Sequence, residues 1–292
     1  MNPPQKLSSL PGHDRVVDYY NSTWFDYRAL WLNDKTRAIH FGYWDDGVKT
    51  HERSLLRMNE VMAEFGGVKE GDKVLDAGCG VGGSSLWMAE TIGAHPVGIA
   101  PVAMQIEKAQ RYAVERGVAD KASFELGDYR ETRFADETFD IVWVAEALVH
   151  VGLADRERFV NEAYRVLKPG GSLVITEYLR FSRPYEPTDE KVLEDWYSGW
   201  AMHDLATQNE IMGWIDKAGF ADGDLKDITR YVMPSLHRLF ILTVAFYPMA
   251  KALHLTKLRD DTAHNNVRSS LKQWHALGRR LWFYSLIRAT KP

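Results

Sequence analysis

The chain of 292 residues has a single cysteine, Cys79, which excludes an internal disulfide bond and any metal site built from several cysteines. An excess of one charge is also lacking, because the formal net charge is −4 and the isoelectric point is near 6.2. Such a balance offers no basic field to hold nucleic acid or an anionic membrane. The first residues, Met-Asn-Pro-Pro-Gln-Lys, lack the apolar core of a signal peptide. We therefore expect a cytoplasmic protein without a nucleic-acid partner.

Long apolar runs are scarce as well. The longest, residues 239–253, contains Thr243 and Pro248 and is shorter than the roughly 20 residues that a membrane-spanning helix needs. We expect this run to form a lid or an interface helix, and we expect no transmembrane segment. The hydrophobic content of 45% and the charged content of 26% are sufficient for a substantial core in one α/β domain with additions.

Apolar strands alternate with amphipathic helices between Lys73 and about Tyr178, which is typical of a parallel, doubly wound α/β sheet. In such sheets, ligands bind beyond the carboxyl ends of the strands. The loops after the strands, which include residues 78–83 and 145–150, are therefore expected to surround one cleft. The predicted strands are 73–77, 95–99, 121–126, 138–144 and 171–179, and the predicted helices are about 83–92, 102–116 and 154–167.

Glycine is concentrated immediately after the first predicted strand. Gly78, Gly80 and Gly82 lack a Cβ and can adopt positive φ, so the backbone can approach a ligand, and the helix that follows offers free N–H groups to an anion. These features predict a site for a nucleoside cofactor. The same turn satisfies the G-x-G-x-x-G dinucleotide pattern, which alone is weak evidence and requires an acid about 20 positions later. Residues 96–100 read Pro-Val-Gly-Ile-Ala, whereas the acid Asp76 precedes the glycines.

Residues 73–83, Lys-Val-Leu-Asp-Ala-Gly-Cys-Gly-Val-Gly-Gly, resemble motif I of the S-adenosylmethionine (SAM) methyltransferases. Residues 98–105 resemble the Gly-Ile-Thr-x-Ser-x-x-Gln segment of the branch that includes the sterol, tocopherol and prenyl-diphosphate C-methyltransferases. The N-terminal signature of that branch corresponds to Tyr19-Tyr20, Trp31 and residues 39–44. This resemblance implies a Rossmann-like sheet of seven strands. A strand near 223–230 and an apolar edge strand at 280–288 are expected to complete it.

The resemblance also implies SAM as the cofactor and indicates its binding residues. Gln105 is expected to meet the ribose and Asp128 the adenine amine, although Gln105 as an exposed helical residue and Asp128 as a turn residue are the alternatives. Tyr19 and Tyr20 are expected to close over the methionine end. The predicted cofactor-binding residues are Tyr19, Tyr20, Asp76, Gly78, Gly80, Gly82, Ala100, Gln105, Asp128, Tyr129 and Ala145.

Aromatic residues are enriched in two segments. Residues 19–44 contain nine aromatic residues, where the chain average of 12% would give about three, and a second group follows the fifth predicted strand. An alkene that accepts a methyl group leaves a carbocation, which aromatic faces stabilise, whereas an oxygen or nitrogen acceptor usually needs a general base. The aromatic enrichment therefore favours methylation of a carbon–carbon double bond, and the resemblance implies that this bond belongs to an isoprenoid. The predicted aromatic residues of the substrate site are Trp31, Phe41, Trp44, Tyr178, Trp196 and Trp200.

Four residues are predicted to be catalytic: Glu146, His150, Glu177 and Tyr20. Residues 146–150, Glu-Ala-Leu-Val-His, resemble the Glu-Ala-x-x-His run of the sterol C-methyltransferases, and residues 175–178 resemble their Tyr-Glu-Trp step. The resemblance implies that one of the two glutamates faces the cation and removes its proton. Structural roles for both glutamates and for a buried histidine stay open. Val149 replaces the bicarbonate-holding glutamate of the cyclopropane synthases, which disfavours cyclopropanation.

The most specific substrate that the resemblance implies is a linear prenyl diphosphate, geranyl or farnesyl, whose cation is then deprotonated or cyclised. Arg230 and Arg238 are expected to contact the diphosphate. No Asp-rich magnesium motif occurs, so any Mg²⁺ would arrive with the substrate. The alternatives are a small-molecule O- or N-methyltransferase, a sterol C-methyltransferase and a non-catalytic SAM-binding scaffold.

The sequence divides into four predicted parts. Residues 1–60 are expected to form an N-terminal helical cap and residues 61–179 the SAM-binding core. Residues 180–260 are expected to supply the helices of the substrate pocket and its lid, and residues 261–292 a C-terminal helix and the edge strand. The oligomeric state is left open by the sequence, with a homo-oligomer as one alternative.

Overall fold

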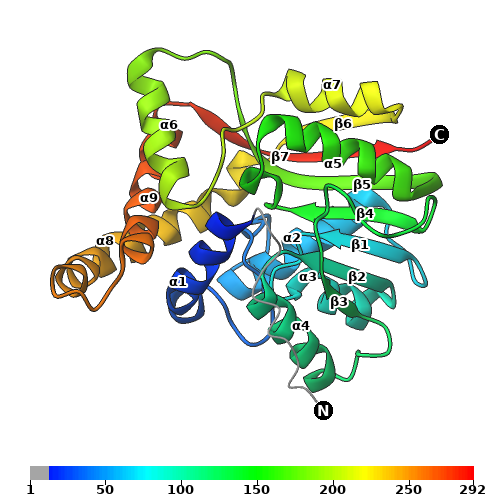
Figure 1. The fold of residues 1–292 in the computed structure, drawn as a ribbon, viewed down its shortest axis with the longest axis horizontal. Helices are drawn as coiled ribbons and strands as arrows, with labels where there is room; N and C mark the ends of the chain where they lie inside the picture. Colours follow the sequence, from blue (N-terminus) through cyan, green and yellow to red (C-terminus); the bar gives the residue numbers. More distant parts are fainter. Residues whose placement is uncertain (1–12) are drawn as a thin grey trace.

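The protein is built around a seven-stranded sheet, which a computed structural model describes together with its helices for residues 13–292. The strand order is β3-β2-β1-β4-β5-β7-β6 (Figure 1). Strands β1 to β5 are parallel, and β7 runs antiparallel to both β5 and β6. The strands are β1 (Lys73–Ala77), β2 (His95–Ala100), β3 (Ser123–Leu126), β4 (Phe139–Ala145), β5 (Leu167–Arg180), β6 (Ala221–Asp227) and β7 (Trp282–Thr290).

Helices cover both faces of this sheet. On one face, α2, α3 and α4 bury residues such as Met58, Leu86 and Ala109, and on the other face α5 and α7 bury Phe159 and Ile215. The predicted doubly wound architecture is therefore confirmed. The helical segments are α1 (Asp14–Leu30), α2 (His51–Gly66), α3 (Gly83–Trp87), the π-helical turn η1 (Met88–Ile92), α4 (Ala103–Glu115), the 3₁₀ turn η2 (Leu148–His150), α5 (Leu153–Val166), α6 (Pro187–Gly199), α7 (Gln208–Ala218), α8 (Thr229–Leu255) and α9 (Asp261–Gly278).

The last strand lies inside the sheet, which corrects the prediction of an edge strand at 280–288. β7 pairs with β5 on one side and with β6 on the other. Its side chains are buried on both faces, as a central strand requires, whereas β6 has the sequence Ala-Asp-Gly-Asp-Leu-Lys-Asp and is mostly exposed. Charged residues suit an edge because they discourage pairing with another chain. The polar strand is therefore the edge, and the apolar strand is covered by it.

Helix α8 is longer than the apolar run 239–253 that the sequence analysis considered. It continues through Pro234 and Pro248 for 27 residues. Among the helices of residues 13–292, α8 alone is long and apolar enough to cross a membrane, by length and composition only, and a single such helix is weak evidence. The absence of a transmembrane segment and the cytoplasmic location stay predictions. The N-terminal residues used in the signal-peptide argument belong to residues 1–12, outside the described part.

Helices from distant parts of the sequence lie at the edge of the sheet where the parallel strands end. α1 lies next to the carboxyl ends of the parallel strands, with α8 and α9 beyond it (Figure 1). α9 packs against α6, α8 and α1. These helices belong to three of the four predicted parts of the chain, and the division itself stays a prediction.

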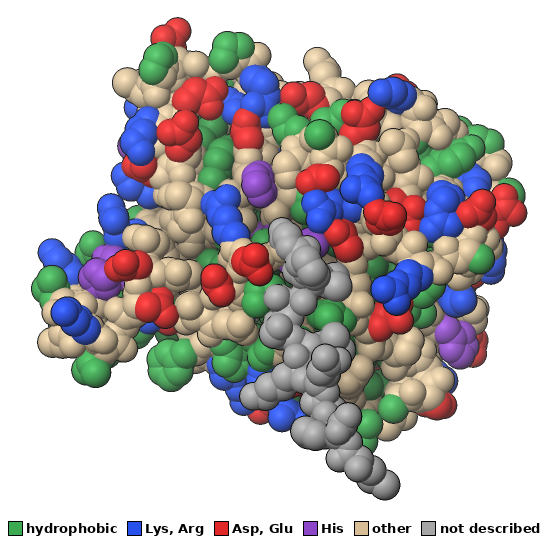
Figure 2. Space-filling model, viewed as in Figure 1, with side chains coloured by type: hydrophobic (Ala, Val, Ile, Leu, Met, Phe, Trp, Pro, Cys, Tyr) green, Lys and Arg blue, Asp and Glu red, His purple; other side chains and the backbone are tan. Residues whose placement is uncertain are grey.

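The surface carries both charges in mixture. Figure 2 shows Lys and Arg side chains interspersed with Asp and Glu over this face of the molecule, without a broad area of one sign. On this face, the arrangement agrees with the small formal charge of −4.

Candidate active site

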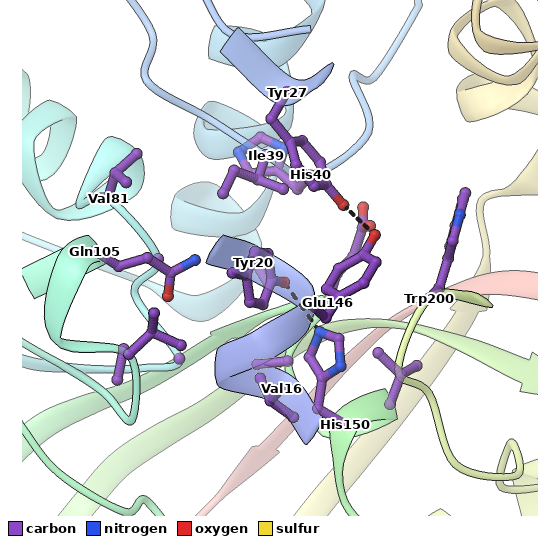
Figure 3. A pocket seen from close by; sticks show the side chains of 18 of the residues that line it. Val16, Tyr20, Tyr27, Ile39, His40, Val81, Gln105, Glu146, His150 and Trp200 are labelled. Carbon is purple, nitrogen blue, oxygen red and sulfur yellow. Dashed lines mark hydrogen bonds between the residues drawn. The ribbon is translucent and has the colours of Figure 1, made fainter. Parts of the chain in front are cut away.

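A buried cavity lies at the carboxyl edge of the sheet, between the glycine turn after β1 and helices α8 and α9. Its volume is about 180 Å³. Gly78 and Gly80 line one part of it, and Thr243 of α8 and Asn266 of α9 line another. Figure 3 shows Gln105 and Val81 at one side of the cavity and Trp200 at the opposite side. The site predicted around the strand ends therefore corresponds to one cavity.

The glycine turn brings backbone close to this space. Gly78, Gly80 and Gly82 have φ values of +89°, +54° and +87°, a region that residues with a Cβ rarely adopt. A Cβ on Gly78 would lie 2.3 Å from the Cβ of Ala147. Gly82 does not line the cavity, because it packs against the ring of Phe124, where a Cβ would lie at 2.8 Å. Gly78 and Gly82 thus allow close packing within the protein, whereas a Cβ on Gly80 would have only Ile39, at 3.4 Å, within 4 Å, so Gly80 leaves room beside the cavity.

Asp76 braces the turn. Its carboxylate accepts a hydrogen bond from the Ser85 hydroxyl at 2.6 Å, which ties the end of β1 to the start of α3. Burial raises the pKa of Asp76 to about 6, although the hydrogen bonds from Ser85 oppose this change. Asp76 also lines the cavity, where a predicted cofactor-binding residue should lie.

Gln105 and Asp128 both face the cavity. Gln105 is only 3% exposed, so the alternative of an exposed helical glutamine is wrong. Burial alone would raise the pKa of Asp128, but hydrogen bonds from His13 and Arg130 hold it well below its usual range. The His13 Nε2 lies 3.0 Å from the carboxylate. Asp128 is therefore an anion with two partners, His13 and Arg130, that the sequence analysis did not identify.

Most other predicted cofactor residues also line the cavity. The Tyr129 hydroxyl donates to the carbonyl of Ala147 at 3.0 Å and so fixes the loop after β4. Cavity-lining members of the predicted set are Tyr19, Tyr20, Asp76, Gly78, Gly80, Ala100, Gln105, Asp128, Tyr129 and Ala145.

These residues fit SAM. A glycine turn suits the close approach of its amino-acid part, and the Asp128 carboxylate after β3 and the Gln105 amide in the first turn of α4 suit its adenosine. Within residues 13–292, no group of three or more His, Cys, Asp or Glu side chains is placed to hold a metal ion.

Glu146 is held by three hydrogen-bond donors from distant parts of the chain. Its carboxylate accepts hydrogen bonds from the Tyr178 hydroxyl at 2.5 Å, the Tyr284 hydroxyl at 2.6 Å and the Phe41 backbone N–H at 2.6 Å. Its backbone has φ +54°, which is unusual for a residue other than glycine and is typical of functional sites. Burial raises the pKa of Glu146, and the three donors oppose the rise. Tyr284 was not predicted, because β7 is about 140 residues away in the sequence.

His150 faces the cavity as a neutral imidazole. Its Nδ1 lies 3.1 Å from the carbonyl of Ala201, which can only accept, so Nδ1 carries the proton. Nε2 therefore accepts the hydrogen bond from the Tyr20 hydroxyl at 3.0 Å, drawn as a dashed line in Figure 3. Burial lowers the pKa of His150 to about 4, although the bond to Ala201 opposes this. The predicted pair Tyr20 and His150 is thus in direct contact.

Glu177 lies outside the cavity lining, in contrast to the expectation that it faces the cation. Successive residues of a strand point to opposite faces, and Tyr178 takes the face toward Glu146. The Glu177 carboxylate instead accepts from the backbone N–H of Val149 at 3.2 Å and of Tyr178 at 2.9 Å. Burial raises the pKa of Glu177 to about 8, although the nearby Arg156 guanidinium opposes this. Glu177 therefore supports the η2 turn that presents His150.

Some of the predicted aromatic residues line the cavity, and others lie outside it. Trp44 lies outside the lining because its indole N–H donates to the Ser235 hydroxyl at 2.9 Å, and Trp196 is fully buried against Tyr178 and Trp282. The predicted aromatic residues that line the cavity are Trp31, Phe41, Tyr178 and Trp200.

The two predicted diphosphate ligands are also displaced from the cavity. Arg230 is exposed and contacts the Tyr231 hydroxyl. Arg238 lies with its guanidinium 5.6 Å from the ring centre of Trp31 and donates to the carbonyl of Leu30 at 3.0 Å. Single arginines in an apolar helix give no indication of which face they occupy, and their contact with a diphosphate stays a prediction.

Residues 74–171 match the model of a methyltransferase domain. The chain is 30% identical over 226 residues to 27-O-demethylrifamycin SV methyltransferase of Amycolatopsis mediterranei (strain S699), which covers 77% of either protein. The chain belongs to the SAM-dependent methyltransferase family. It is also 32% identical over 238 residues to sterol 24-C-methyltransferase erg6 of Schizosaccharomyces pombe (strain 972 / ATCC 24843), covering 80% of this methyltransferase and 61% of the relative.

The fold is similar to that of solved methyltransferases. A structure of geranyl diphosphate methyltransferase with GPP and sinefungin superposes with a TM-score of 0.74 at 18% identity, over 97% of this chain and all (100%) of that one. At this identity the likeness shows the fold alone. The predictions of the family, the seven-stranded fold and the methyltransferase activity are confirmed.

Substitution of Gly78 tests the glycine turn. Gly78→Ala places a Cβ against Ala147 and in a positive-φ conformation, so we expect SAM to bind at least about tenfold more weakly, equivalent to about 1.4 kcal/mol. Isothermal titration calorimetry with SAM measures the loss. Gly117→Ala is the matched control, because Gly117 has φ +68° but no atom within 4 Å of the added Cβ. Equal SAM affinity of Gly78→Ala and wild type contradicts this assignment.

The raised pKa of Glu177 predicts a pH-dependent stability. The folded state favours the protonated carboxyl, so this contribution is fully present below the usual carboxyl pKa and is lost as the pH rises toward 8. We expect Glu177→Gln to lose less stability than wild type between pH 5 and pH 8, with a difference of about 3–6 °C in Tm. Thermal unfolding across this pH range measures it. Glu194→Gln, at an exposed position, is the control, and parallel pH profiles of wild type and Glu177→Gln exclude the effect.

Proposed function

We propose that this methyltransferase adds the methyl group of SAM to a carbon–carbon double bond of an isoprenoid substrate. The observation that carries the proposal is the Glu146 carboxylate, held by three donors at the edge of a buried cavity with aromatic walls. SAM supplies an electrophilic methyl carbon when bound. The chain must then hold the substrate in line, exclude water and tolerate the carbocation that the alkene becomes.

The cavity walls suit a cation. Tyr20, Tyr27, Trp31, Phe41 and Trp200 line it, and a ring face near a cation contributes roughly 0.5–2 kcal/mol. Glu146 adds a full negative charge in its ionised form, and its tyrosine donors orient that charge toward the cavity. Together, these groups favour a positive centre over the neutral alkene, as a transition-state-directed site should.

Two groups are positioned to remove the proton that ends the reaction. Glu146 and the unprotonated Nε2 of His150 both line the cavity. A proton adjacent to a carbocation is so acidic that a weak base, such as His150 with its pKa near 4, suffices. Movement of Tyr20 away from His150 would free Nε2 for this task.

The second candidate is O- or N-methylation of a small molecule, for which the same unprotonated Nε2 would serve as the general base. The contact between the neutral His150 and the Tyr20 hydroxyl favours this second candidate specifically. It resembles the contact between a general base and the hydroxyl group of a substrate that is to be methylated. The alternative of a non-catalytic scaffold receives no support from the family membership.

The finer proposal of a prenyl diphosphate with Mg²⁺ rests on the sequence resemblance and on the fold shared with geranyl diphosphate methyltransferase. Arg37 is the one Arg or Lys among the described lining residues, and it lies in an ion pair of 2.7 Å with Asp34. The lining therefore supports the isoprenoid part of the substrate better than the diphosphate.

Product analysis tests the proposed function. The enzyme is incubated with SAM labelled with ¹³C in the methyl group and with geranyl, farnesyl and geranylgeranyl diphosphates and their alcohols. We expect products heavier by one CH₂ unit, because the methyl group replaces a proton, and a ¹³C chemical shift typical of a methyl group bound to carbon in nuclear magnetic resonance. A label bound to oxygen or nitrogen supports the second candidate, and no turnover of any isoprenoid contradicts the proposal.

Substitution of Glu146 separates its charge from its shape. We expect Glu146→Gln to reduce kcat about 100-fold, because the stabilising anion is lost, and to leave SAM affinity unchanged. Tyr284→Phe keeps the anion but removes one donor, so a smaller loss of about tenfold is expected. Steady-state kinetics and SAM titration measure both. Unchanged turnover and product pattern in Glu146→Gln would exclude its role.

A further inference from the structure

We infer that the end of the cavity between α1, α8 and α9 is a subsite for an uncharged, hydrogen-bonding head group of the substrate, such as the hydroxyl of an isoprenoid alcohol. The inference rests on the proposed function. Four polar residues from three helices line this end: Asp26, Thr243, Asn266 and Ser270. Asp26, Thr243 and Ser270 are 5–6% exposed, so their polar atoms are shielded from bulk water.

The charges of the subsite cancel. Asp26 forms an ion pair with Arg259 through both guanidinium Nη atoms, one of them at 2.9 Å. Arg259 is itself only 8% exposed and stands behind Asp26, outside the lining. A cationic head group would compete with Arg259 for the carboxylate, and an anionic one would lie beside a carboxylate without a free cation. An uncharged group meets neither penalty.

Hydrogen bonds fix the orientation of the subsite. The Asn266 amide donates to Asp26 at 3.1 Å and accepts from the Tyr19 hydroxyl at 2.9 Å, which determines which way its oxygen points. Because Tyr19 donates to Asn266, its oxygen accepts from the Tyr27 hydroxyl, at 2.9 Å. The polar groups are therefore preorganised before a substrate enters.

One polar group lacks a partner. Thr243 makes no side-chain hydrogen bond to any residue of the described part of the chain, although a helical threonine commonly bonds to the carbonyl four residues earlier. Its side chain is 95% buried at a cavity wall, so its hydroxyl is available to a bound group. A substrate hydroxyl can donate a hydrogen bond to Thr243 Oγ1, and it can equally accept a hydrogen bond from the Thr243 hydroxyl.

The position of the subsite agrees with methyl transfer to a carbon atom at the opposite end of the isoprenoid substrate. Leu239, Phe246 and Val267 provide apolar wall next to the polar residues, whereas Glu146 lies at the end of β4. Helices α8 and α9 lie beyond α1 from the sheet edge (Figure 1). A head group held at α8 and α9 therefore keeps the hydroxyl away from SAM and leaves a distant double bond toward Glu146.

The experiment compares three farnesyl probes: farnesol, farnesyl diphosphate and the hydrocarbon with a methyl group in place of the hydroxyl. We expect kcat/KM to be highest for farnesol and at least about 100-fold lower for the diphosphate, because a buried anion stays unpaired. Thr243→Val removes the hydroxyl at nearly constant shape. It is expected to lower kcat/KM for farnesol about tenfold through KM and to leave the hydrocarbon unaffected.

Thr256→Val is the matched control, since Thr256 lies on the exposed end of α8. Preference for the diphosphate, with the methyl group still on carbon, overturns the head-group assignment and leaves the proposed function standing. Equal effects of Thr243→Val on farnesol and on the hydrocarbon overturn it as well. Binding of farnesol that depends on Thr243, measured by calorimetry without any C-methylated product, supports the subsite and contradicts the proposed function.

Discussion

The carboxylate of Glu146 connects three segments of this enzyme through hydrogen bonds. Its three donors come from the segment before α2, from β5 and from β7, so one buried anion contacts three distant stretches of the chain. A buried charge is tolerated only when it is fully hydrogen-bonded. The position of Phe41, the register of β7 against β5 and the shape of the cavity wall are therefore coupled. Movement of any one donor would leave charge unpaired inside the protein.

Helix α1 is held over the cavity by apolar packing of Val16 and Val17 against Val102 and by polar contacts. His13 contacts Asp128, Arg15 donates to the carbonyl of Met202 at 3.1 Å, and Asp26 pairs with Arg259. Tyr20 adds its bond to His150. Each polar contact joins α1 to a different wall of the cavity, so α1 connects the regions proposed for the cofactor and for the substrate.

The sequence predicted the parts whose local pattern fixes them. Gly78 and Asp76 were identified because a glycine turn after an apolar strand brings backbone close to a ligand, and because their spacing resembles a known motif. The side chain of Glu177 was expected to face the cavity, but it points to the opposite face of the sheet. The alternation of side chains along β5 decides that face, and the position of β5 in the sheet depends on its pairing with β7. The contact between Asp26 and Asn266 could not be predicted, because 240 residues separate them in the sequence. The i to i+4 pattern within a helix gives no information about which helix packs against it. Tyr284 was missed for the same reason.

The interior place of β7 bears on the order in which the protein is made. The five parallel strands precede α6, α8 and α9 in the chain, and each can pair with a neighbour once it has left the ribosome. β6 cannot join the sheet until β7 fills the gap beside β5. Tyr284 arrives with β7, so the third donor to Glu146 is also the last to be synthesised. A nascent chain that has produced every glycine and acid of the site therefore still lacks the strand that closes its wall.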